Sequence, residues 1–369
     1  MSMNWKGNWK AKLAILLALM LVGTSIMLGC QDIDEDAKKN GEEGEEAEEG
    51  VTQFSWGTAD TGSAGHTALT ALVTVLNREM DDYNFNVLPT PGAVYSMTDF
   101  AHGELDGFYG ADVGFLEYAE ERSRFEEFEY DEAERDLVQA FWGYTLEVGL
   151  AVHADDYDEY DEWRDLEGET MFTGPAAWDV RAALDIPLQD QLGMDFNYEE
   201  IDLDMVGSSL DAGHIDGINA YTSGESTVPS WLIEAELESD IEVINPSEEE
   251  IEILNEGGVE VVDVDPDVFE TDMEEDTVKR IPFYYGFHMG PEEVPAEDVH
   301  EMLNVIKEHT DELTEQDETF AQIDEDMVDI QVRGIESTID YVEIHPGTRD
   351  FLEEHDAWNS DWDDNVAGE

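Results

Sequence analysis

Negative charge is the feature that most restricts how this chain can fold. The sequence contains 94 Asp and Glu residues against 16 Lys and Arg residues, so its formal net charge at pH 7 is -78. Repulsion of this size opposes compaction at low ionic strength, whereas molar salt screens most of it. A hydrophobic content of 41% and an aromatic content of 10% are ample for a core. The composition therefore predicts a folded, halophilic protein and argues against nucleic acid or anionic membrane surfaces as partners.

The N-terminus has the pattern of a secretory signal that ends in a lipobox. Three lysines precede an apolar stretch over residues 13–28, which leads into the sequence MLGC ending at Cys30. Cleavage before Cys30 would leave this residue as a lipid-bearing N-terminus. An uncleaved transmembrane anchor is the alternative, because the apolar stretch falls just short of a comfortable span. Either arrangement predicts a protein held on the extracellular face of the cytoplasmic membrane, and we expect residues 1–30 to be a signal peptide with Cys30 lipidated.

The rest of the chain divides into a linker and two expected lobes. Residues 31–50 are acidic with almost no apolar side chains, which is typical of an extended, disordered spacer. The roughly 320 residues that follow exceed what one core usually serves, so two lobes are expected. We predict lobe 1 over residues 51–148 plus 280–369 and lobe 2 over residues 149–279. Cys30 is the only cysteine, which excludes a disulfide framework and a thiolate metal site.

Periodicity predicts an α/β fold class, because strands, glycine-containing loops and helices follow one another in order. The stretch over residues 137–152 has the length of one long strand or two consecutive ones and is the natural crossover between lobes. The expected strands are 52–56, 85–88, 107–114, one that runs into a loop within 171–175, and 215–220. Residues 259–264 are expected near the return, and residues 277–289 are expected to lead the chain back to lobe 1. The expected helices are 67–80, 95–102, one from about 115, one from about 179, 295–313 and 317–332.

An ordered series of motifs resembles the TAXI family of TRAP-transporter solute-binding proteins over nearly all of the chain beyond residue 51. The most specific is HPGTRDFLEE at residues 345–354, which is similar to the family's closing segment. The glycine-rich loop GTADTGSAGH at 57–66 looks like its ligand loop. The turn at 103–107 is similar to its acidic turn before a strand, 165–168 is similar to its start of lobe two, and 211–217 is similar to the turn before its late lobe-two strand.

The resemblance implies a two-lobed, periplasmic-binding-protein-like (type II) Venus-flytrap fold with the ligand in the cleft between lobes. It also implies a membrane partner, the permease subunits of a TRAP-type secondary transporter driven by an ion gradient. The ligand expected from this class is a small carboxylate, such as glutamate, or another organic anion. No enzymatic activity, cofactor or metal is expected.

The first loop also has a physical reason to bind an anion. Its residues lack bulky side chains before His66, so backbone N–H groups at the start of the following helix can approach a carboxylate closely. The first expected ligand residues are Ser63, Ala64, Gly65 and His66. A structural glycine turn is the alternative reading of this loop.

Further candidates follow from the positions that correspond to the family's other ligand loops. The loop at 90–96 contributes Gly92, Ala93 and Tyr95, and the loop at 173–179 contributes Gly174, Ala177 and Trp178. Ala93, Tyr95 and Trp178 depart from the family pattern, which leaves the ligand identity open. Arg181 offers a guanidinium fork to a carboxylate, with a surface ion pair to Asp179 or Asp185 as the alternative. Tyr221 is a candidate for closing over the ligand or, equally, a core residue.

Two other functions stay open from sequence alone. A ligand sensor that signals to a receptor kinase would use the same fold. A secreted hydrolase is the other, although acidic pairs carry little information in so acidic a chain, and no metalloprotease, serine-hydrolase or phosphate-loop motif is present. The acidic run at 263–267 could hold Ca²⁺ weakly, but a solvated face explains it more simply.

Overall fold

The computed structural model describes residues 50–368, except positions 60, 62, 177, 272 and 275. The expected signal peptide, Cys30 and nearly all of the linker lie outside the described residues, as does Ala177. Within the described part of the chain, no helix is long and apolar enough to cross a membrane.

Lobe 1 begins with strands that alternate with helices. The first two strands pair in parallel, with Thr52 opposite Tyr83 and Gly57 opposite Leu88. Both end on the same edge, so the helices that follow them start close together. The elements are β1 (Thr52–Gly57), α2 (Ala64–Glu79), β2 (Tyr83–Leu88), α3 (Ala93–Ala101), β3 (Phe108–Ala111) and α4 (Asp112–Ala119).

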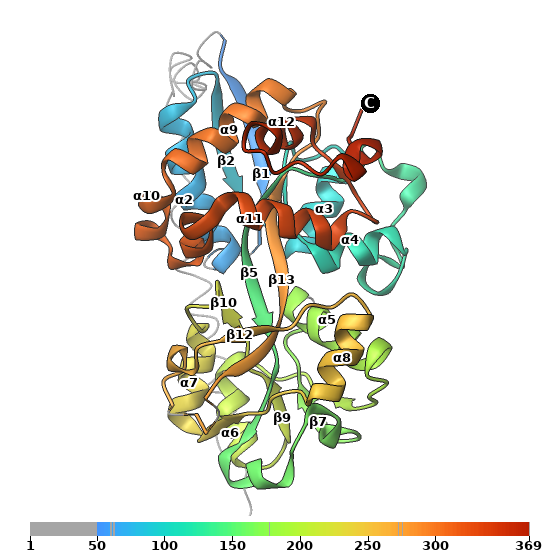
Figure 1. Ribbon diagram of the computed structural model, residues 1–369, viewed down its shortest axis with the longest axis vertical. Helices are drawn as coiled ribbons and strands as arrows, with labels where there is room; N and C mark the ends of the chain where they lie inside the picture. The colour runs from blue at the N-terminus through green and yellow to red at the C-terminus, as the bar shows by residue number, and fades with distance from the viewer. Residues whose placement is uncertain are drawn as a thin grey trace, which may run out of the picture. The chain divides into compact units, whose positions relative to one another are not determined.

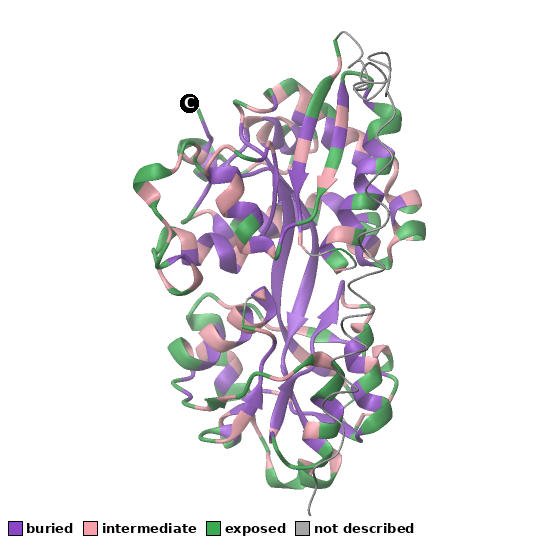
Figure 2. Cartoon of the chain, turned by 180° about the vertical axis from the view of Figure 1, so that it is seen from behind, coloured by how far each residue is buried: buried purple, intermediate pink, exposed green. Residues whose placement is uncertain are grey.

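Two long antiparallel strands connect the lobes, as Figure 1 shows. They are β5 (Phe141–Val148) and β13 (Val278–His288), which pair along most of their length with a register shift between Tyr285 and Gly286. β4 (Val138–Gln139) precedes β5, and β6 (Leu150–His153) continues it into lobe 2 after Gly149. Both long strands are buried almost throughout (Figure 2), so the crossover between lobes is part of the core.

Lobe 2 contains a five-stranded mixed sheet in the order β11-β6-β9-β7-β8. Two further short strands extend the crossover ribbon, β10 beside β5 and β12 beside β13. The strands are β7 (Thr170–Phe172), β8 (Asn197–Tyr198), β9 (Gly217–Asn219), β10 (Thr222–Ser223), β11 (Ile241–Val243) and β12 (Val262–Val264). The helices are α5 (Asp179–Ile186), α6 (Val206–Asp211), α7 (Ser230–Glu238) and α8 (Glu248–Glu256).

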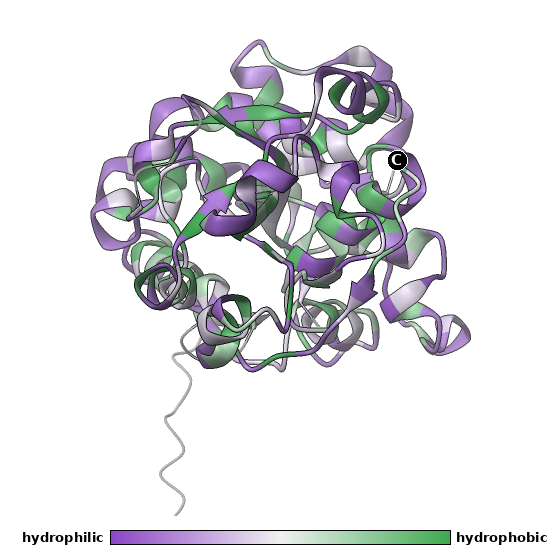
Figure 3. Cartoon of the chain, turned by 90° about the horizontal axis from the view of Figure 1, so that it is seen from below, coloured by the Kyte–Doolittle hydropathy of each residue, from purple (hydrophilic) through white to green (hydrophobic). Residues whose placement is uncertain are grey.

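The chain returns to lobe 1 for its C-terminal helices. α9 buries Val299, Met302, Leu303 and Ile306, a spacing that places one apolar stripe on the core. Hydrophilic and hydrophobic positions alternate in this way along the helices in Figure 3. The elements are α9 (Ala296–Glu308), α10 (Thr310–Gln316), α11 (Ala321–Thr338), β14 (Glu343–Ile344) and α12 (Pro346–Glu354). The predicted α/β class with two lobes is confirmed by this topology.

Several boundaries differ from the sequence prediction, each for a local reason. α2 starts at Ala64, three residues before the predicted 67, because the Ser63 side chain caps it by accepting the His66 N–H at 3.2 Å. The predicted strand over 107–114 ends at Ala111. α4 begins at Asp112, whose carboxylate accepts the Val113 N–H at 2.6 Å, so residues 112–114 are helical.

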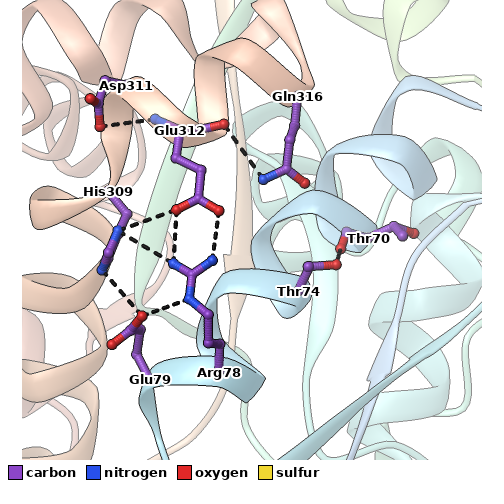
Figure 4. Close-up of polar contacts among 8 residues, drawn as sticks. All are labelled: Thr70, Thr74, Arg78, Glu79, His309, Asp311, Glu312 and Gln316. Atoms are coloured by element: carbon purple, nitrogen blue, oxygen red, sulfur yellow. Dashed lines mark hydrogen bonds and ion pairs between the residues drawn. The ribbon is translucent and has the colours of Figure 1, made fainter.

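An exposed network of charged side chains fixes the C-terminal end of α2 against α10 (Figure 4). Arg78 forms a two-pronged ion pair with Glu312, at 2.6 Å and 2.8 Å, and a third bond with Glu79 at 2.7 Å. His309 lies 3.4 Å from Glu312 and 3.6 Å from Glu79. The hydrogen bonds of Arg78 to both carboxylates raise its pKa and lower that of Glu312. These contacts join α2 to α10 at the end of α2 that is opposite the first expected ligand loop.

Candidate functional site

The first turn of α2 has the geometry of an anion-binding helix N-terminus. The N–H groups of Ala64 and Gly65 have no acceptor within the helix by its geometry, and Ala64 is exposed. Gly65 lies against the ring of Tyr109: a Cβ at this position would stand 2.5 Å from the Tyr109 Cζ atom. A glycine is therefore required for this close approach.

Polar atoms at both ends of the first loop are shielded from solvent and lack a partner among the described residues. They are the Thr58 hydroxyl and the His66 Nδ1 atom. Buried polar atoms normally find a hydrogen bond, so an unpaired one calls for an explanation such as a water or a ligand. Thr58 was not singled out from the sequence, because a threonine after a strand is an unremarkable turn residue.

The second loop is tied directly to the first. The Thr90 hydroxyl donates to the Thr58 carbonyl at 2.5 Å and, in a second contact, approaches the Gly92 carbonyl at 2.8 Å. Gly92 caps α3, which begins two residues before the predicted 95, so Ala93 and Tyr95 lie in its first turn. Ala93 is buried, whereas half of the Tyr95 surface is exposed. The two loops thus form one edge of lobe 1.

In lobe 2, the loop after β7 leads into the first turn of α5. Gly174 has a φ of +124°, a conformation that side chains rarely adopt, and Trp178 is the residue before the helix. Asn219 holds this loop by donating to the Thr173 carbonyl at 3.2 Å and the Val180 carbonyl at 3.0 Å. This positioning role of Asn219 was missed by sequence reasoning, because it depends on the pairing of β9 with β7.

The guanidinium of Arg181 is engaged within lobe 2. Its Nε atom lies 3.0 Å from the Asp185 carboxylate, and its plane covers the Tyr198 ring at 3.5 Å. Burial raises the pKa of Asp185, which the attraction of Arg181 offsets in part. The ion pair with Asp185 is one of the two alternatives that the sequence left open for this arginine.

Tyr221 lies in the interior of lobe 2. Its hydroxyl accepts a hydrogen bond from the Trp231 indole at 3.3 Å, and burial raises its pKa to about 12. Two large aromatic residues of lobe 1, Trp56 and Trp142, are completely buried. They belong to the core.

A buried aromatic pair on the crossover ribbon brings the two lobes' loops together. The rings of Tyr109 and Tyr285 stack in parallel, 4.7 Å apart at an angle of 4°. The Tyr285 hydroxyl donates to the Asp179 carboxylate at 2.7 Å. Gly65 contacts the same Tyr109 ring, so the first turn of α2 in lobe 1 connects through two tyrosines to the first turn of α5 in lobe 2.

An arginine that the sequence analysis overlooked completes this connection. Arg124 of lobe 1 forms ion pairs with Asp179 and with Glu117, the latter through Nε at 2.7 Å. Although burial opposes its charge, the attraction of these two carboxylates raises the pKa of Arg124. Burial raises the pKa of Tyr109 and Tyr285 as well, so both stay neutral and able to donate. No local pattern distinguishes Arg124 within its acidic surroundings.

A separate pocket of about 510 Å³ lies beside the crossover, between α4, α5, β13 and α11. Among the described residues, none of those predicted to bind the ligand lines it. In the described ranges there is also no group of three or more His, Cys, Asp or Glu side chains arranged to hold a metal ion, the acidic run at 263–267 included.

Comparisons with known proteins give distant likenesses only. No protein-family model matches the chain, and no curated protein sequence matches it. Among solved structures it is similar to a putative sulfonate-binding protein from Methylobacillus flagellatus, with 10% identity, a TM-score of 0.45, and coverage of 84% of this chain and 96% of that one. It is also similar to the aliphatic sulphonate-binding protein of Escherichia coli, with 12% identity, a TM-score of 0.43, and coverage of 77% and 74%.

A third solved structure is a TctC solute-binding protein from Polaromonas, with 13% identity, a TM-score of 0.42, and coverage of 74% of this chain and 88% of that one. All three are binding proteins by name, and the two sulfonate-binding proteins are named as periplasmic. Likenesses at these TM-scores show neither the family nor the ligand of this chain.

Proposed function

We propose that this chain is an extracytoplasmic solute-binding receptor that captures a small organic anion, such as glutamate or another carboxylate, for the permease subunits of a TRAP-type transporter. The TAXI motifs support this transporter type, and the lipobox supports attachment through Cys30 to the outer face of the cytoplasmic membrane. The two-lobed α/β topology is the architecture that such receptors require.

The observation that carries the proposal is the connection between the first turns of α2 and α5 across the Tyr109–Tyr285 pair. Helix N-termini present unpaired N–H groups and the positive end of the helix dipole, which favour an anion. Backbone donors and the Ser63 side chain suit a carboxylate through charge-assisted hydrogen bonds. A ligand here would contact both lobes.

The crossover supplies the hinge in this proposal. Gly149 separates β5 from β6, and β13 runs unbroken through the return crossing. Bending at these strands would move lobe 2 relative to lobe 1, as in other hinged binding proteins. The closed, loaded form would then be the one that the permease recognises.

Calorimetry in molar KCl with glutamate, 2-oxoglutarate and other small carboxylates tests the proposal. Gly65→Ala is expected to weaken binding about 10-fold or more, which corresponds to roughly 1.4 kcal/mol, because the added methyl group displaces Tyr109. Ser63→Ala is expected to weaken it less, and Ser208→Ala, at an exposed position of α6, is the matched control. Absence of binding by every carboxylate, or wild-type affinity in the Gly65 variant, would contradict the proposal.

A further inference from the structure

The pocket beside the crossover has walls from both lobes. Its floor is formed by residues 281–284 of β13. Lobe 1 contributes residues of α4 and α11, and lobe 2 contributes residues of α5 and the segment 257–260. An occupant of this pocket would therefore touch both lobes, at a place different from the proposed anion site.

Much of the lining is apolar. Val113 and Leu116 of α4 face Ala183 and Ile186 of α5, and Phe283 lies in the floor. A volume of about 510 Å³ accommodates a molecule with one or two rings. The body of a suitable ligand is thus hydrophobic.

The cationic group of the pocket is already paired. Arg333 lies 3.3 Å from the Glu260 carboxylate and 3.8 Å from that of Asp329, and it stacks over the Tyr284 ring at 5.5 Å. The Tyr284 hydroxyl donates to the same oxygen of Glu260 at 3.3 Å. The Arg333 guanidinium and the Tyr284 hydroxyl are therefore committed to carboxylates of the protein, and the Ser337 hydroxyl donates to the Gly334 carbonyl at 2.8 Å.

Several acceptor groups of the pocket lining take no hydrogen bond or ion pair among the described residues. The Gln191 side-chain oxygen is shielded from solvent without a partner in the described part of the chain, since its nitrogen donates to the Gly257 carbonyl at 3.3 Å. Glu336 forms no ion pair within the described residues, and the second oxygen of Glu260 takes no hydrogen bond there. Open acceptors with net negative charge select a ligand that donates hydrogen bonds and carries positive charge.

We propose that this pocket is a second binding site, which takes an organic cation made of an ammonium group on an aromatic or aliphatic body. The ammonium group bonds Glu336 and Glu260, and the body packs on β13 between α4 and α5. Because the occupant bridges the lobes, it stabilises their present arrangement and alters the affinity of the anion site by linkage.

Calorimetry of the full-length protein in molar KCl with tryptamine tests the site, with tryptophol and indole-3-propionate as neutral and anionic analogues of the same ring. We expect tryptamine to bind at least about 10-fold more tightly than tryptophol and indole-3-propionate not to bind. Glu336→Gln is expected to weaken tryptamine about 5-fold. Glu325→Gln, on α11 but outside the pocket, is the matched control and should leave binding unchanged.

A second variant fills the pocket. Ala182→Trp, at a half-buried position of α5, is expected to abolish tryptamine binding, while Ala212→Trp, exposed in lobe 2 and away from the pocket, should preserve it. The proposal is overturned if tryptamine does not bind the wild type at millimolar concentration, if indole-3-propionate binds more tightly, or if Glu336→Gln and Ala182→Trp both bind as the wild type does. Carboxylate titrations run separately report on the anion site, so the two proposals fail independently.

Discussion

Replacing Arg280 with methionine is expected to stabilise the protein, although it removes a residue from the centre of the crossover. Arg280 is completely buried, and its Nε and Nη2 atoms have no hydrogen-bond partner among the described residues. Only Nη1 is paired, with the Lys279 carbonyl at 3.0 Å. Burial lowers the pKa of Arg280 to about 9, although Glu147 attracts the charge.

The magnitude follows from this pKa. Each unit of pKa difference between folded and unfolded chains is about 1.4 kcal/mol, so keeping Arg280 charged in the fold costs roughly 5 kcal/mol. The substitution forfeits the bond to Lys279, about 1 kcal/mol, whereas the attraction of Glu147 is already contained in the pKa of about 9. The Glu147 carboxylate keeps its bonds from Thr145, Thr222 and the Glu225 N–H. A net gain of up to about 4 kcal/mol is expected, as for other buried charges replaced by apolar groups.

The pH dependence of the free energy of unfolding provides an independent check that the substitution is stabilising. Because the pKa of Arg280 is lower in the folded chain, the unfolded chain binds more protons above about pH 9. The free-energy cost of the buried charge is therefore fully present at neutral pH. It declines as the pH rises from about 9 towards the pKa of arginine in the unfolded chain. The difference in stability between the variant and the wild type should shrink over this range, since the tyrosines titrate equally in both proteins.

Urea unfolding in molar KCl at a series of pH values is the assay. Arg164→Met is the matched control: Arg164 is partly exposed and pairs at 3.6 Å with an exposed Glu249, so its loss should change stability by less than about 0.5 kcal/mol. An Arg280→Met variant that is less stable than the wild type by more than about 1 kcal/mol would refute the reasoning. That result would mean that Nε and Nη2 form stabilising hydrogen bonds in the folded protein.

Three further outcomes are expected. Gly347→Ala should destabilise the protein by about 3 kcal/mol in urea unfolding, because its Cβ would stand 2.4 Å from the Ala296 carbonyl oxygen, a backbone atom that cannot rotate away; a loss below about 1 kcal/mol would mean that α9 shifts easily. Burial lowers the pKa of His345 to about 4, so the unfolded chain binds more protons below about pH 6.5 and stability falls by about 2 kcal/mol between pH 7 and pH 5. His345→Asn keeps an acceptor for the Gly347 N–H and should reduce that loss, and an unchanged pH profile would contradict it. Finally, transfer from molar to about 0.1 M KCl should lower the thermal midpoint, because a net charge of -78 is then less screened; a midpoint that is independent of salt would remove the halophilic interpretation.

Part of the candidate site could be predicted from the sequence, because it depends on neighbouring residues. The loop 57–66 has no bulky side chain before His66, and Ser63 stands where a helix cap is favoured. These properties place a helix N-terminus after the first strand. They do not predict which residues the helix packs against. Gly65 contacts Tyr109, which lies 44 positions further along the chain and is brought there by the fold.

Pairing among charged residues could not be predicted. With 94 acidic residues, each arginine has several possible partners, and sequence offers no distance between them. In the structure, Arg181 forms an ion pair with Asp185, whereas Asp179 forms an ion pair with Arg124 and accepts a hydrogen bond from Tyr285. Arg280, by contrast, lies in the segment expected to lead the chain back to lobe 1, yet its burial without an ion pair among the described residues follows from the packing of the crossover alone.

The sequence by itself determined the alternation of strands and helices and the length of the crossover, since periodicity acts over a few residues. Only the tertiary structure decided which strands pair, which carboxylates meet each arginine and where the second pocket opens. The antiparallel pairing of β5 with β13 joins segments more than a hundred residues apart, and long-range contacts of this kind leave no local pattern for a sequence to display.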